Sequence, residues 1–180
     1  MALIKSCKGI SPQFGDNCWF AENATIIGDV KMGNECSVWF SAVVRGDVNS
    51  IRFGNRVNIQ DGAVVHCTFQ NLSQNQPGSK TVLGNNVSVG HNAIIHGCTI
   101  EDNVLIGMGA IVMDDCYIES NCILAAGAVL LEGIKMESWS VYAGVPAKKV
   151  KTLSKELFKG EVERIAHNYL IYSSWFKEEK

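Results

Sequence analysis

The sequence contains no apolar run approaching the ~20 residues that a membrane-spanning helix needs. Its opening, MALIKSCKGI, also lacks the apolar stretch of a secretory signal peptide. The net charge is only −2, too weak a bias to favour binding to nucleic acid or to an anionic membrane surface. We therefore expect a cytoplasmic protein with neither nucleic acid nor membrane as a partner.

The seven cysteines include no CxxC pair, and their odd number cannot pair fully within one chain. Reduced thiols that act as small apolar residues are the better interpretation, and they fit the cytosol. With 180 residues, 47% of them hydrophobic, the chain is long enough for one globular domain with an appendage.

An internal repeat of six residues runs along most of the chain, a period that neither a helix nor an alternating strand gives. A small or β-branched residue follows most of the large apolar ones by four positions. The large residues are Phe20, Ile26, Met32, Val38 and Val44, then Phe53, Ile59 and Val65, then Leu83, Val89 and Ile95, then Ile100, Ile106, Val112, Ile118, Leu124, Leu130, Met136 and Tyr142. The pattern predicts an all-β fold, a parallel β-helix in which three hexads make one coil and coils stack ~4.8 Å apart.

The hexads stop after Pro146, where apolar residues adopt helical spacing. We therefore predict a β-helix domain over residues 1–150 and a C-terminal helix, packed along it, within residues 151–180. The polar segment FQNLSQNQPGSK, residues 69–80, carries Pro77 and predicts a loop inserted between coils.

The hexad register brings histidines together. Val44, Val65 and Ile95 fall on one face of successive coils, so the residues that follow them, Arg45, His66 and His96, should form a column. Imidazoles on adjacent rungs ~4.8 Å apart can bind one ion at ~2.0 to 2.1 Å.

His91 lies on the other side of a corner and should not reach that ion within one chain. It could serve a neighbour's pair, which implies a ring of subunits with metals at the interfaces. Three histidines would leave a position for water, whose pKa falls to ~7 on zinc. The alternative is that each histidine only forms hydrogen bonds at a corner. The nearby Arg45, Asp47, Gln60 and Asp61 favour the metal site.

The segments VVRGDV (43–48), NIQDGAVVH (58–66), VGHNAIIHG (89–97) and AGVPAKKV (143–150) resemble the γ-class carbonic anhydrases, a branch of the hexapeptide-repeat proteins. The resemblance runs from about residue 10 through the terminal helix. It implies a left-handed prism and a homotrimer with three interface metals that hydrates CO₂ to bicarbonate.

The resemblance also implies roles for single residues. His66 and His96 of one subunit and His91 of the next would bind Zn²⁺, with Fe²⁺ or Co²⁺ as possible replacements. Gln60 would hydrogen-bond the metal-bound solvent, with Asn58 beside it. Arg45, Asp47 and Asp61 would order the interface between subunits. An ion pair that holds the subunits together would explain these three residues equally well.

Two departures from the family pattern concern proton transfer. Val48 stands where studied members carry an acid, and the segment from Cys67 to Lys80 contains no Asp or Glu. Turnover could then be slow. Two other functions stay open: an acyltransferase or thioesterase acting on a CoA thioester, and a non-catalytic scaffold that keeps its metal.

Overall fold

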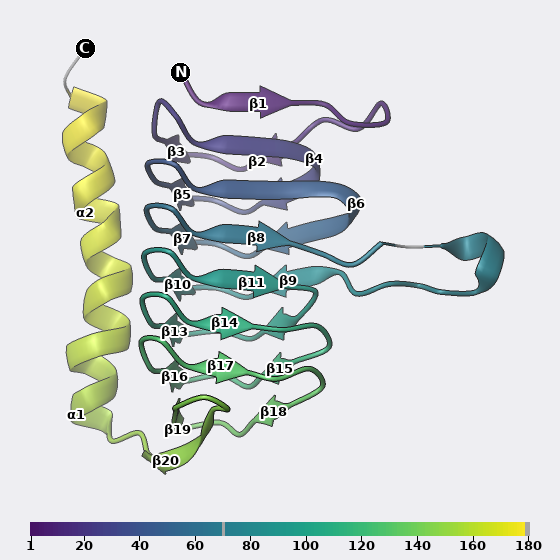
Figure 1. Ribbon diagram of the computed structural model, residues 1–180. Coiled ribbons are helices and arrows are strands. Elements are labelled where there is room, and N and C mark those ends of the chain that lie inside the picture. The colour runs from purple at the N-terminus through teal and green to yellow at the C-terminus, as the bar shows by residue number, and fades with distance from the viewer. Residues whose placement is uncertain (70, 179–180) are drawn as a thin grey trace.

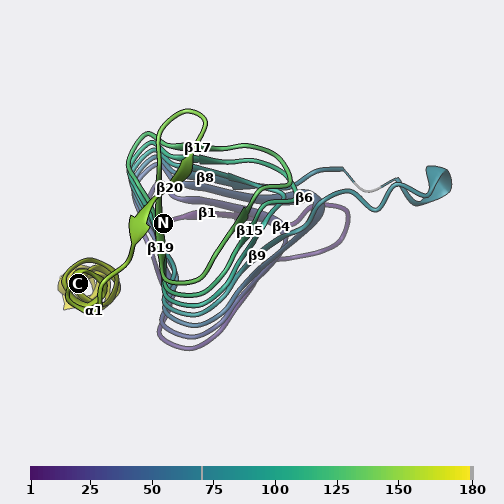
Figure 2. The same cartoon turned by 90° about the horizontal axis from the view of Figure 1, so that it is seen from below.

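The computed structural model describes residues 1–69 and 71–178 and consists of a stack of coils with one long helix beside it (Figure 1). Gln70, in the predicted loop, and Glu179 and Lys180, at the end of the predicted C-terminal segment, lie outside the described residues. Seen along the stack, the coils have a triangular outline, and the inserted loop projects from one corner (Figure 2).

Each face of the prism is a stack of short strands, all parallel to their neighbours except β20, the last strand of the third face. The first face consists of β1 (Leu3–Lys5), β4 (Thr25–Met32), β6 (Val43–Phe53), β8 (Val64–His66), β11 (Ile94–His96), β14 (Ile111–Val112) and β17 (Val129–Leu130). The second consists of β2 (Gln13–Phe14), the later parts of β4 and β6, β9 (Thr81–Leu83), β12 (Thr99–Ile100), β15 (Tyr117–Ile118) and β18 (Lys135–Met136). The third consists of β3 (Trp19–Phe20), β5 (Ser37–Val38), β7 (Asn58–Ile59), β10 (Ser88–Val89), β13 (Val104–Ile106), β16 (Cys122–Leu124), β19 (Ser140–Ala143) and β20 (Lys148–Thr152).

The six-residue repeat forms this architecture because one large residue per hexad fills the interior. Ile59, Ile95 and Ile106 are fully buried, and the small residues Ala93 and Ala110 are buried at the corners. Polar side chains accept hydrogen bonds from backbone N–H groups in the turns between strands. A ladder of side-chain oxygens accepts the backbone N–H one coil away, at Asn34, Asn55, Asn85 and Asp102. The predicted β-helix is confirmed.

Two features interrupt the regular coils at the same corner. Gly28 of β4 pairs with Gly46 of β6, and Val30 pairs with Ile51, so the β6 residues 47–50 bulge opposite Asp29. The predicted loop follows β8 and contains a short 3₁₀ helix, η1 (Leu72–Gln74). Both insertions leave the register of the flanking coils intact.

The C-terminal segment closes the stack and then returns along its third face. β20 pairs antiparallel with β19, so the predicted boundary between residues 150 and 151 falls inside a strand. A continuous helix follows, composed of α1 (Lys155–Leu157), the π-helical segment η2 (Phe158–Glu163) and α2 (Arg164–Glu178). Phe158 and Val162 pack on Ile123 and Val141 of the third face. In the described part of the chain, no helix has the length and apolar character needed to cross a membrane.

Candidate functional site

The predicted column of Arg45, His66 and His96 forms. Val43 pairs with Val64, and Val64 with Ile94, so the residues two positions later stack on successive rungs. His66 and His96 are themselves paired, with ring centroids 5.1 Å apart. Nδ1 of His66 lies 3.1 Å from Nε2 of His96. The register thus places two imidazole nitrogens face to face at one corner of the prism.

A carboxylate holds each ring from its far side. Oδ1 of Asp47 lies 3.0 Å from Nε2 of His66, and Oδ1 of Asp114 lies 2.5 Å from Nδ1 of His96. Since these carboxylates occupy the outer nitrogens, the facing nitrogens are left for another ligand. Carboxylates that fix the orientation of an imidazole in this way are the usual outer partners of metal-binding histidines.

The surroundings of His66 keep this imidazole suited to a metal. Burial lowers the pKa of His66, against the hydrogen bond to Asp47, which raises it. Burial acts to raise the pKa of Asp47, but hydrogen bonds from His66 and from Arg45, whose Nη1 lies 2.6 Å from Oδ2, bring it below its usual value. A neutral imidazole beside an ionised carboxylate is the state that binds a divalent ion.

The facing pair fits a tetrahedral metal ion. Two Zn–N bonds of ~2.0 to 2.1 Å at a tetrahedral angle would separate the nitrogens by about 3.3 Å. The observed separation between His66 and His96 is 3.1 Å, so a small movement of either ring suffices. Among residues 1–69 and 71–178 of one chain, no three His, Cys, Asp or Glu side chains converge on a common ion position. The chain alone therefore offers two facing nitrogens.

His91 lies at a different corner, in the turn between β10 and β11. Its side chain is 41% exposed, and its Nδ1 lies 2.9 Å from Oδ2 of Asp61. The predicted site residues thus form two groups: Arg45, Asp47, His66 and His96 meet at one corner, and His91 meets Asp61 at another. The carboxylate orients this third imidazole as Asp47 and Asp114 orient the other two.

The predicted amide residues belong with His91. Asn58 lies within β7 and Gln60 directly follows this strand, and both side chains are buried. Nε2 of Gln60 donates to Oδ1 of Asn58 at 3.1 Å, and Nδ2 of Asn58 donates to Oγ of Ser88 at 2.8 Å. Gln60 and His91 both line a cavity of about 420 Å³ between the third face and α2. The second corner therefore carries an oriented imidazole next to a fixed amide.

Comparison with known proteins shows what this chain is similar to. A family model described as bacterial transferase hexapeptide (six repeats) matches residues 97–132. A probable carbonic anhydrase of Methanocaldococcus jannaschii is 51% identical over 156 residues, covering 87% of this chain and 91% of that protein. The carbonic anhydrase of Geobacillus kaustophilus is 40% identical, covering 97% of this chain and 91% of that protein.

The chain belongs to the γ-class carbonic anhydrase-like family of hexapeptide-repeat proteins. Another relative, protein YrdA of Escherichia coli, is 40% identical over 93% of this chain and 90% of its own length. The crystal structure of a putative acetyltransferase of Bacillus cereus matches with a TM-score of 0.91 and 34% identity, covering 99% of both chains. The family resemblance expected from the four motifs is confirmed.

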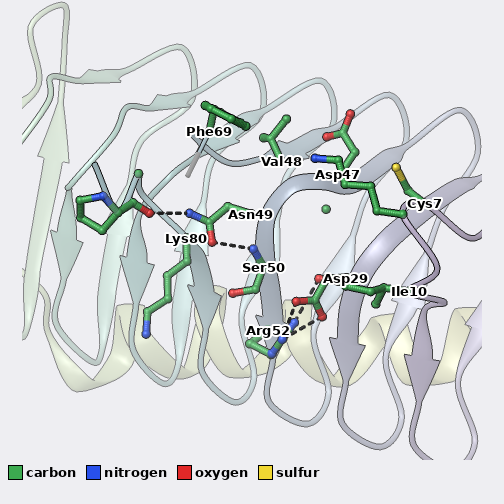
Figure 3. A pocket seen from close by; sticks show the side chains of 14 residues that line it. Cys7, Ile10, Asp29, Asp47, Val48, Asn49, Ser50, Arg52, Phe69 and Lys80 are labelled. Carbon is green, nitrogen blue, oxygen red and sulfur yellow. Dashed lines mark hydrogen bonds and ion pairs between the residues drawn. The ribbon is translucent and has the colours of Figure 1, made fainter. Parts of the chain in front are cut away.

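The surface beside Asp47 bears on the proton transfer expected from the family resemblance. A cavity of about 650 Å³ opens beside Asp47, between the bulge of β6, the inserted loop and the N-terminal segment (Figure 3). Val48 and Phe69 line it, and the acids on its wall, Asp29 and Asp47, are already paired with arginines. No lining residue supplies an unpaired carboxylate within the described part of the chain. A second depression, beside His96, is lined by Glu132, so the expectation of slow proton transfer stays a prediction.

Asp114 is the functional side chain that sequence reasoning missed. It faces Gly97, where an added Cβ would clash with Oδ1 of Asp114, so the glycine admits the carboxylate to His96. The hydroxyl of Thr68 also donates to Asp114. The register held the necessary signal, because Val112 pairs with Ile95 and so places residue 114 opposite Gly97.

The cysteines beside the histidines are not ligands in this arrangement. Sγ of Cys67 donates to the backbone oxygen of Asn49 at 3.2 Å, and burial raises the pKa of this thiol to about 11. Burial also raises the pKa of Cys98, which is 1% exposed. Both remain protonated thiols that fill the corners.

Proposed function

We propose that this chain forms a homotrimer that hydrates CO₂ to bicarbonate at zinc ions shared between subunits. His66 and His96 of one subunit and His91 of the next would hold each ion. The observation that carries the proposal is the 3.1 Å approach of Nδ1 of His66 to Nε2 of His96, with carboxylates on both outer nitrogens. Fe²⁺ or Co²⁺ would suit the same imidazole ligands.

Bound zinc supplies a hydroxide nucleophile near neutral pH. The chain's own residues supply orientation. Asp47 and Asp114 fix the two rings of the pair, and Asp61 fixes His91. Gln60, held by Asn58, presents a fixed amide beside His91, where it can donate to or accept from a reacting oxygen. Substrate and product would both be small, CO₂ and bicarbonate.

The surface around the paired histidines supports an interface there. Ile94, Met113 and Leu131 are exposed apolar residues on the rungs of His96 and on those below it. A depression of about 140 Å³ lies beside His96 and is lined by Met113 and Asp114. Exposed apolar surface next to polar groups is typical of a protein contact. His91 is exposed at another corner, as a ligand for a partner subunit must be.

Mixing two inactive variants tests this arrangement directly. His91→Ala and His96→Ala subunits should each lack zinc and CO₂ hydration, because every interface has lost a ligand. In trimers reassembled from an equal mixture, about a quarter of the interfaces would combine an intact pair with an intact His91, so about a quarter of the activity should return. Stopped-flow hydration and zinc analysis of the mixture would measure this recovery.

The matched control mixes His66→Ala with His96→Ala subunits, which restores no complete interface. Activity in neither mixture, despite trimers in light scattering, would contradict the shared site. Full activity of the His91→Ala protein alone would contradict the role of that residue. We also propose a cytosolic location, which all seven free cysteines support.

A thioester-processing function is the alternative, and one observation favours it. The cavity of about 420 Å³ between the third face and α2 has Leu105, Met108, Ile123 and Ile165 on its walls and is far larger than CO₂ requires. A panel of acyl-CoA substrates would test this alternative. A zinc-loaded trimer that turns over neither CO₂ nor any thioester would instead be a metal-binding scaffold.

A further inference from the structure

The β-helix stacks two pairs of cysteines in the same local geometry. Cys18 and Cys36 directly precede the paired residues Trp19 and Ser37, and N of Trp19 donates to O of Cys36 at 2.9 Å. Cys98 and Cys116 precede Thr99 and Tyr117, and N of Thr99 donates to O of Cys116 at 2.9 Å. Each pair therefore has side chains at the same place on neighbouring rungs.

The surroundings of the two pairs differ sharply. Cys98 and Cys116 are each 1% exposed, whereas Cys18 is half-buried above a Cys36 that is 1% exposed. Lys177 donates from Nζ to the backbone oxygen of Asn17 at 2.9 Å, which places an ammonium group close to Cys18. Solvent therefore reaches one thiol of the first pair and neither thiol of the second.

The pKa values of the thiols also differ between the two pairs. The Cys36 side chain beside it lowers the pKa of Cys18 to about 7, against burial, which raises it, and Lys177 lowers it further. The same contact and burial raise the pKa of Cys36. In the second pair, burial raises the pKa of both thiols. A thiolate at neutral pH is the reactive form of cysteine.

We propose that Cys18 and Cys36 form a redox-active pair, in which Cys18 reacts with a low-molecular-weight disulfide and Cys36 resolves the product into an intramolecular disulfide. The rungs of a β-helix lie ~4.8 Å apart, within the Cα separations of 4.4 to 6.8 Å that disulfides span. Only the half-buried thiol can meet the incoming disulfide. The buried thiol beneath it then completes the exchange.

The exchange balances with glutathione disulfide as the oxidant. The Cys18 thiolate attacks one sulfur, forming a mixed disulfide and releasing one glutathione thiolate. Cys36 loses its proton to that thiolate and attacks Sγ of Cys18, which releases the second glutathione. Counted from two thiols, the cysteines lose two electrons and two protons, one of the protons when Cys18 ionises, and this proton returns to the second glutathione thiolate through solvent; glutathione disulfide is thus reduced to two glutathione molecules. The mixed disulfide also ends the contact between the two thiols, which removes one cause of the high pKa of Cys36.

The test treats the full-length protein with glutathione disulfide at neutral pH, quenches with acid, alkylates the remaining thiols and maps unreduced peptides by mass spectrometry. The wild-type protein should show a transient glutathione adduct on Cys18 followed by a Cys18–Cys36 cross-link, which dithiothreitol reverses. Cys36→Ser should stop the reaction at the adduct. Cys36→Ala should also stop there but form the adduct more slowly, because it removes the side chain that lowers the pKa of Cys18. Cys18→Ser should leave Cys36 unmodified.

Cys116→Ser provides the matched control, because it breaks the buried pair and should leave the Cys18–Cys36 cross-link unchanged. The proposal is overturned if the wild-type protein keeps the Cys18 adduct without forming the cross-link. It is equally overturned if Cys98 and Cys116 cross-link as fast as Cys18 and Cys36 in the folded protein. The wild-type time course needs no variant, so a variant that fails to fold leaves this test intact.

Discussion

The upper and lower coils use the same place in the hexad for different purposes. The column that starts with Arg45, His66 and His96 continues with Met113 and Leu131, because Ile95 pairs with Val112, and Val112 with Leu130. The backbone register is the same along the column. The upper members meet carboxylates, whereas Met113 and Leu131 are exposed apolar side chains.

This difference separates what the fold requires from what the chemistry requires. The inward residues just before the column, Val44, Val65, Ile95, Val112 and Leu130, are all fully buried, so the interior does not distinguish the two regions. The insertions do distinguish them. The bulge of β6 supplies Asp47, and the loop after β8 supplies Thr68, which orders Asp114. The paired histidines therefore lie where the outward residue of the column is polar and a nearby insertion supplies a polar side chain to hold it.

The largest effect should come from the column itself. His96→Ala removes one of two facing nitrogens, so bound zinc and CO₂ hydration should both fall to background. Leu131→Met, two rungs below in the same column, should retain both. Zinc content by mass spectrometry and stopped-flow hydration would measure the two variants. One zinc per subunit in the His96→Ala protein would mean that the metal lies elsewhere.

A smaller effect should come from the carboxylate behind the ring. Asp114→Asn weakens the partner of His96 and should lower zinc affinity about 10- to 100-fold, as loss of such outer partners usually does. Asp115→Asn is the matched control, since Asp115 accepts a hydrogen bond from Ser79 instead. Competition with a chromophoric chelator would give both affinities. Equal affinities would show that Asp114 does not act through His96.

The sequence predicted the fold and the histidine pair because both depend on counting hexads. One large apolar residue every six positions is enough to place Ile95 over Val65, and this register also places His96 over His66. Asp114 escaped prediction because an aspartate in a corner segment such as MDDC is also an ordinary turn residue. β20 escaped because Lys148–Thr152 is exposed and charged and its strand is formed only by pairing with the last coil.

The two regions should be equivalent in packing, and conservative core changes would test that. Ile95 and Ile106 are both fully buried, one beside the site and one among the regular coils. Ile→Val at either position should cost about 0.5 to 1.5 kcal/mol in the free energy of unfolding. Urea denaturation of the metal-free proteins at matched concentration would compare them. A much larger cost at Ile95 would mean that the site and the core beneath it are coupled.

The smallest effect concerns pH, because His66 in the upper column can bind a proton and Met113 and Leu131 in the lower column cannot. Burial lowers the pKa of His66 in the folded protein, whereas the unfolded chain binds its proton near pH 6.5. Below that pH the unfolded state holds more protons, so stability should fall as pH decreases through this window. The lowered pKa values of Asp47 and Asp114 add a loss only below about pH 4.

Thermal unfolding of the metal-free protein between about pH 7.5 and about pH 5.5 avoids the carboxylate window, and comparison with a His66→Gln variant isolates His66 from the other three histidines. The unfolding midpoint of the wild-type protein should fall more across this range than that of His66→Gln, which keeps a polar side chain but cannot take up the proton. Met113 and Leu131 contribute no proton in the lower column. If the two proteins respond equally, burial of His66 does not set its protonation, and the neutral imidazole at the paired site would need another cause.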